Sequence, residues 1–194
     1  MAMEQRKRAH LINSVGGFKS VCLIGTADKT GNTNLAIFSS IVHIGANPPL
    51  ICFIMRPDSV ERHTLSNILE TGIYTINHIT ENMYRQAHQT SARYPKNISE
   101  FDATGLTIEY KNNFKAPFVK DSTIQLAVEF KERIDLTINN TIMVIGEINQ
   151  LYLPNDCLCE DGYLDIEKAG TITCSGLDSY HTTNRLQRLE YAKP

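Results

Sequence analysis

The segment from Asn34 to Ser40 carries polar side chains inside a run of residues that otherwise indicates a buried strand. Successive side chains of a strand point to opposite faces of the sheet, so Asn34 and Ser40 share one face and Ser39 lies on the other. Buried amide and hydroxyl groups need hydrogen-bond partners. Either the serines bond neighbouring strands, or this segment lines a pocket for a polar ligand.

A second group of polar residues follows at positions 56–64, with two arginines, one histidine and two hydroxyl residues. It begins as a turn and leads into a segment with helical spacing of apolar residues. The first turn of a helix presents free N–H groups and the positive end of the helix dipole, so it binds phosphate readily. Arg62 and Thr64 would add charge-assisted hydrogen bonds. The alternative is an ordinary capped and solvated helix start.

The sequence around these two segments is dominated by strand patterns. Apolar runs separated by turn residues predict strands at residues 21–26, 33–44, 50–55, 72–77, 125–134, 141–153 and 172–174. Residues 50–55 are apolar on both faces, which fits an interior strand or one covered by a second copy of the chain. Many strands with a few short helices predict a mainly β fold, an antiparallel barrel with peripheral helices.

Helical spacing predicts one helix over residues 60–70 and a second over residues 80–89. Asp58 or Ser59 is expected to cap the first helix, and Gly72 to end it. Thr80 is expected to cap the second. Residues 92–105 are expected to form an irregular loop.

Composition limits the classes of function. The 194 residues, 42% hydrophobic and 21% charged, predict a single folded domain over residues 1–194. A net charge of -2, with scattered Lys and Arg, argues against a nucleic-acid partner. No apolar run approaches the roughly 20 residues that span a bilayer, and residues 1–10 do not resemble a secretion signal. We therefore expect a cytoplasmic protein without a membrane partner.

Several chemistries lack their sequence signatures. Four histidines show no metal-ligand spacing, and the Cys157 and Cys159 pair has the wrong spacing for a zinc knuckle, so no metal site is expected. There is no G-x-G-x-x-G fingerprint of a dinucleotide-binding Rossmann domain and no G-x-S-x-G elbow of a hydrolase.

Five runs in order, residues 31–40, 47–50, 62–68, 70–72 and 74–77, resemble the flavin reductase-like family of FMN-binding split β-barrels. The resemblance implies that FMN is the cofactor, and it implies a role for individual residues. It assigns the flavin ring to Asn34, Phe38, Ser39 and Ser40, the phosphate to Arg56, Ser59, Arg62, His63 and Thr64, the edge of the site to Asn77 and Ser91, and the nicotinamide side to Tyr180 and His181.

Two positions depart from the family pattern. Ile37 stands where many members have proline, and His63 stands where an acidic residue is common. The first change is expected to be tolerated. The second would add positive charge near the phosphate.

By the same resemblance, the chain is expected to be a homodimeric FMN-dependent oxidoreductase. It would take hydride from NADH or NADPH and pass electrons to a small-molecule acceptor such as free flavin or a ferric complex. The cofactor carries the chemistry, so no catalytic side chain is expected. A non-enzymatic FMN electron carrier or redox sensor is the main alternative, and a split barrel with haem or no cofactor is a third.

Overall fold

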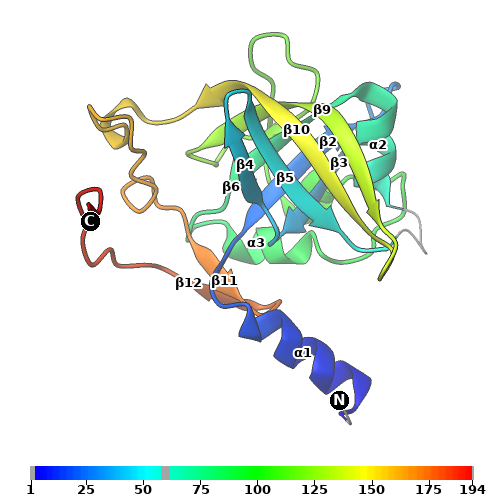
Figure 1. The fold of residues 1–194 in the computed structure, drawn as a ribbon. Coiled ribbons are helices and arrows are strands. Elements are labelled where there is room, and N and C mark those ends of the chain that lie inside the picture. Colours follow the sequence, from blue (N-terminus) through cyan, green and yellow to red (C-terminus); the bar gives the residue numbers. More distant parts are fainter. Residues whose placement is uncertain (1–2, 58–61, 194) are drawn as a thin grey trace.

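A curled antiparallel sheet forms the centre of the computed structural model, which describes residues 3–57 and 62–193 (Figure 1). Its seven strands follow in the order β3 (Thr33–Phe38), β2 (Cys22–Ala27), β6 (Ile73–His78), β9 (Gln125–Leu136), β10 (Thr141–Tyr152), β5 (Pro49–Met55) and β4 (Val42–Ala46). Figure 1 shows β4 and β5 in front of β2 and β3, so the sheet bends back on itself. The predicted mainly β barrel is confirmed.

Short elements surround this barrel. A small sheet joins β1 (Lys19–Ser20), β11 (Thr173–Ser175) and β12 (Ser179–His181), and β7 (Ile108–Glu109) pairs with β8 (Phe118–Val119). The helices are α1 (Gln5–Val15), α2 (His63–Thr71), α3 (Tyr84–Gln89) and α4 (Glu100–Thr104), with a 3-10 turn at Asn155–Cys157. In Figure 1, α1 projects away from the barrel.

Two hydrophobic clusters hold the fold together. The first fills the barrel around Phe53 and Tyr74, and the second lies outside the sheet, where Leu35 packs with Phe101 of α4. Strand alternation explains the division, because Ile24 of β2 belongs to the first cluster and its neighbour Leu23 to the second. Strand β2 is therefore buried along its whole length.

The prediction of one strand over residues 33–44 is wrong, because the chain changes sheet edge in the middle of it. Strand β3 pairs with β2, whereas β4 pairs with β5 at the opposite end of the strand order. The break falls at Ser40, whose hydroxyl donates to the carbonyl of Ile54 at 3.0 Å and accepts from its N–H at 3.1 Å. Val42 is opposite Cys52, so the Ser40 side chain bonds β5 two residues beyond the last pair.

The helices also differ from expectation in part. Helix α2 begins at His63, and Gly72 ends it with a φ of 75°, as predicted; the expected caps Asp58 and Ser59 lie outside the described residues. Helix α3 begins at Tyr84 instead of position 80, because Thr80 is held in a bridge to Thr171. The expected loop over residues 92–105 contains α4, and α1 was not predicted.

Candidate functional site

Three arginines converge at the start of α2. Arg62 occupies the N-cap position, no side chain caps the helix, and the first turn has no acidic residue. The Nε atom of Arg62 is buried, and nothing within the described residues accepts its hydrogen. Burial and the positive charges of Arg56 and Arg93 lower the pKa of Arg62. A desolvated donor, clustered positive charge and a free helix start together favour a bound anion.

The hydroxyl of Thr64 and the amide of Asn34 connect this helix to the sheet. Asn34 Nδ2 donates to Thr64 Oγ1 at 3.0 Å and lies 3.4 Å from Thr26 Oγ1, which also accepts from Asn67 Nδ2 at 3.1 Å. All four residues are buried. The predicted ring residue Asn34 and the predicted phosphate residue Thr64 therefore lie together, and their bond fixes the start of α2 against β3.

The serine-bearing end of β3 is half-buried. Phe38 contacts Phe53 edge to face, with ring centroids 4.9 Å apart. Ser39 is half-buried at the point where the chain leaves β2. For Ser40, the alternative in which the hydroxyl bonds a neighbouring strand is what the structure shows.

The outer edge of β3 carries N–H groups that no strand of the described residues pairs. β3 is the last strand in the sheet order, and the N–H of Leu35 points away from β2 to Glu100 Oε2 at 2.9 Å. N–H groups two residues apart point to the same edge of a strand, so those of Ile37 and Ser39 share this edge. Unpaired N–H groups at the edge of a sheet are available to hydrogen-bond another group. On this edge the first such position is Leu35, which follows Asn34 and is bonded to Glu100.

Comparison with known proteins identifies the fold and the family. Residues 15–167 match the family model of the flavin reductase like domain. The chain belongs to this family. Flavin reductase-like domains bind flavin. The anion site on α2 and the open edge of β3 are therefore features of a chain from a flavin-binding family.

Solved structures of other flavin reductase-like proteins share the whole fold. A candidate flavin reductase with a split-barrel domain, from Shewanella frigidimarina NCIMB 400, is 54% identical with a TM-score of 0.95, over 98% of this chain and 95% of that one. Nitrilotriacetate monooxygenase component B from Bacillus cereus has 23% identity and a TM-score of 0.85, over 97% and 95%. Flavoredoxin of Desulfovibrio vulgaris has 22% identity and a TM-score of 0.77, over 90% and 92%. The last two show the fold alone.

Asn77 is not part of the lining of this flavin reductase-like site. Its side chain is fully buried, with Nδ2 donating to the Leu23 carbonyl and Thr75 Oγ1, and Oδ1 accepting from the Val119 N–H at 3.0 Å. It fixes β8 on the outer face of β6. The family resemblance assigned Asn77 to the edge of the site, whereas in the structure its polar atoms bond the backbone of β2 and β8.

Tyr180 and His181 point to opposite sides of β12. The Tyr180 hydroxyl lies 2.8 Å from His88 Nδ1, and burial raises the pKa of Tyr180 to about 12. Tyr180 and Ile37 both pack against the second hydrophobic cluster. His181 instead packs edge to face against Phe18, 5.0 Å between centroids.

Four further residues bear on the phosphate end. Ser91 is exposed after α3, two positions before Arg93. Arg93 was missed, and no pattern around it indicates a ligand; its link to Arg62 appears only in the fold. His63, the first residue of α2, is half-buried, and Ser59 lies outside the described residues.

No group of three His, Cys, Asp or Glu side chains within residues 3–57 and 62–193 is placed to hold a metal ion. Over the same residues, no helix is both long and apolar enough to cross a bilayer.

Proposed function

We propose that this chain is an FMN-dependent oxidoreductase of flavin reductase type, which passes electrons from NADH or NADPH to a small acceptor. One observation carries the proposal. The anion site at Arg62 and the open edge of β3 are joined by the Asn34–Thr64 hydrogen bond, so they can hold two ends of one molecule.

The phosphate end fits a monoester. A phosphate monoester carries a charge of about -1.5 to -2 near neutral pH, and the positive charge of Arg62 is close enough to those of Arg56 and Arg93 to be repelled by them. Arg62 Nε would donate to the phosphate, and the free N–H groups of the first turn of α2 would share in binding it.

The ring end fits a planar group with hydrogen-bonding edges. N–H groups of Ile37 and Ser39 would bind the polar edge of the isoalloxazine and stabilise negative charge on it. Phe38 and its contact with Phe53 hold the strand end in place. When bound, FMN supplies the hydride and electron transfer. The protein orients the cofactor, and no side chain has to act as an acid or base.

A nicotinamide donor would bind transiently against the exposed side of the ring, and the acceptor would use the same opening. We place this reaction in the cytoplasm, following the sequence. The test is to titrate the purified chain with FMN and then add NADH or NADPH without oxygen. Bleaching of the flavin band supports a reductase. A chain that binds FMN but is reduced by neither donor is a carrier, and a chain that binds no FMN refutes the proposal.

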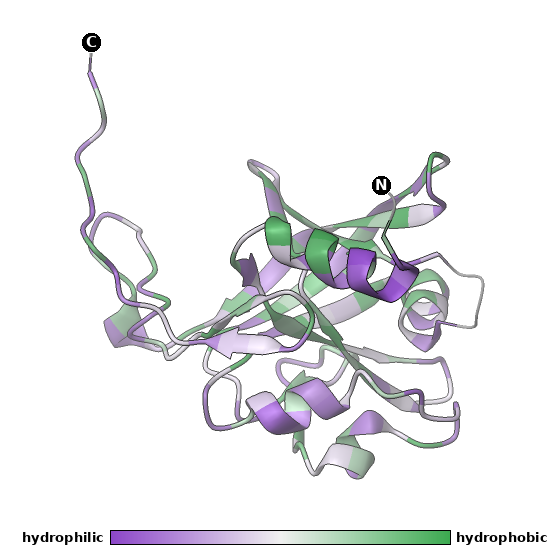
Figure 2. Cartoon of the chain, turned by 90° about the horizontal axis from the view of Figure 1, so that it is seen from below, coloured by the Kyte–Doolittle hydropathy of each residue, from purple (hydrophilic) through white to green (hydrophobic). Residues whose placement is uncertain are grey.

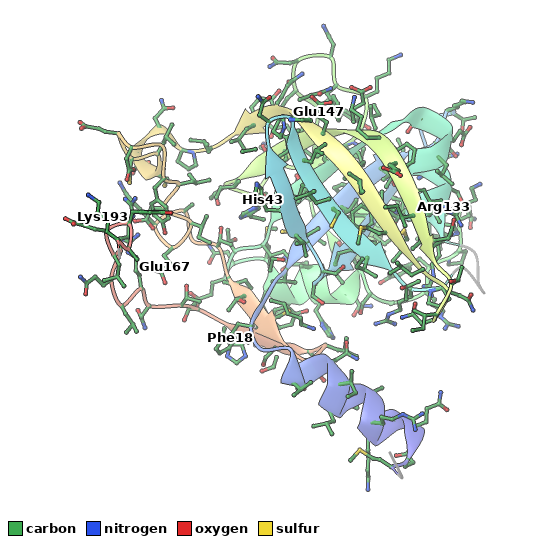
Figure 3. The ribbon with its side chains drawn as sticks, viewed as in Figure 1. Phe18, His43, Arg133, Glu147, Glu167 and Lys193 are labelled. Carbon is green, nitrogen blue, oxygen red and sulfur yellow. The ribbon has the colours of Figure 1, made fainter. Side chains whose placement is uncertain are left out.

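We further propose that the chain works as a homodimer in which α1 contacts a second copy. Leu11, Ile12 and Val15 are exposed on α1, and none of its 11 residues is buried. Figure 2 shows apolar segments on this helix, and Figure 3 places Phe18, 71% exposed, where α1 meets the small sheet. A helix of this length is marginal alone in water, and such apolar surface favours a protein partner.

A further inference from the structure

Glu100 is a buried carboxylate that the proposed function has not yet used. It is only 6% exposed, and its Oε2 accepts the N–H of Leu35 at 2.9 Å. Burial raises its pKa, against the opposing effects of the Leu35 hydrogen bond and the charge of His63. Burying a carboxylate raises the free energy of the folded state unless the group is hydrogen-bonded. The bond from the Leu35 N–H, at the outer edge of β3, offsets part of that cost.

Helix α4 lies along the first half of that edge. Ser99, at the N-cap of α4, bonds the Thr33 hydroxyl with 2.7 Å between the oxygens, and Phe101 packs in the same cluster as Leu35. Glu100 lies between these two contacts. Its carboxylate takes the place that the carbonyl of a neighbouring strand would occupy opposite Leu35. The next N–H groups on this edge are those of Ile37 and Ser39.

Glu100 also faces the start of α2. It lines a small cavity of about 10 Å³ together with His63 and Asn34, and the other charged groups there are Asp28 and Lys96. Roughly 10–15 Å³ is the least that holds one water molecule. Glu100 thus bonds β3 at Leu35 and lines the same cavity as His63, the first residue of α2.

We propose that Glu100 is a positioning residue for the flavin ring: by accepting the Leu35 N–H, it holds the outer edge of β3 so that the N–H groups of Ile37 and Ser39 face the ring. The inference rests on the proposed function. Glu100 acts through the strand and does not touch the cofactor.

The test compares three variants with the native chain by isothermal titration at pH 8, with FMN and with riboflavin, which has no phosphate. Glu100→Ala removes the acceptor and should weaken FMN about tenfold or more, the equivalent of a charge-assisted hydrogen bond. Glu100→Gln keeps a neutral carbonyl acceptor, a weaker partner than a carboxylate, and should weaken FMN binding measurably at pH 8 but by less than about tenfold. Asp102→Ala removes an exposed carboxylate from the same helix and should change nothing.

Two readouts separate positioning from a general loss of structure. Glu100→Ala should weaken riboflavin by the same factor as FMN, because the effect is at the ring. The affinity ratio of native chain to Glu100→Gln should approach one as the pH falls through the pKa of Glu100, because protonated Glu resembles Gln. Since burial raises that pKa, the approach should begin above the pH range of an ordinary carboxyl group. His63, Asp28 and Lys96 are present in both chains, so their titration largely cancels in the ratio.

Native affinity in Glu100→Ala would overturn the inference, and so would a loss for FMN without a loss for riboflavin. If Glu100→Ala does not fold, as judged by circular dichroism, Glu100→Gln decides: a ratio of one at every pH, or a loss greater than tenfold, contradicts the inference. A native chain that binds no flavin refutes the proposed function instead, so the two failures are distinguishable.

Discussion

Replacement of Arg62 by Gln should weaken FMN binding without weakening the fold. Arg62 Nε is already out of contact with solvent and has no acceptor within the described residues, so its donor is available to a ligand. A hydrogen bond to a charged group contributes about 1.5–3 kcal/mol, which corresponds to about a 10- to 150-fold change in Kd. Arg56 and Arg93 repel Arg62, so its removal should leave the melting temperature of the cofactor-free chain equal or higher.

The assay is isothermal titration of the native chain and Arg62→Gln with FMN and riboflavin, with thermal denaturation in parallel. Riboflavin affinity should hardly change, because riboflavin has no phosphate. Arg85→Gln is the matched control, since Arg85 is exposed and lies over the Tyr84 ring on α3. The reasoning is refuted if Arg62→Gln binds FMN like the native chain, or if it loses FMN and riboflavin equally.

Three other changes test the fold and the assembly. Ser40→Ala should lower the free energy of unfolding by about 1–2 kcal/mol, because both polar groups of Ile54 lose their partner; FMN affinity should fall with it, and an unchanged urea midpoint and affinity would contradict this. Tyr74→Phe should be equally stable or up to about 1 kcal/mol more stable, because the buried hydroxyl has no partner in the described part of the chain; a clear loss in the same denaturation would count against it. Ile12→Glu should convert a dimer into a monomer in light scattering while Lys7→Glu should not, and a native monomer at micromolar concentration would exclude the dimer.

The sequence predicted the barrel because strand alternation and turn residues are local signals. For this reason the predicted strand over residues 125–134 lies within β9, and the one over residues 141–153 matches β10 to within one residue. Gly72 ends α2 because only glycine readily adopts a positive φ. The division between β3 and β4 was missed. The apolar pattern continues across Ser40, and the choice of β5 as the new partner depends on contacts far along the chain.

The candidate site was predicted in part, for a similar reason. Arg62 and Thr64 meet at a helix start, which has a sequence signature. Arg93 and Glu100 come from a segment predicted to be loop, and their proximity to α2 and β3 is a tertiary property. Helix α4 did carry a signal, with Ser99 before it, acidic residues in its first turn and Gly105 after it, but its five residues are too few for helical periodicity.

The central claim is that one cofactor binds both the anion site on α2 and the open edge of β3. A crystal structure of the chain grown with FMN tests it most directly. We expect the phosphate to accept from Arg62 and the ring to lie against the N–H groups of Ile37 and Ser39. FMN bound elsewhere on the chain, or no FMN on this surface, would contradict the account.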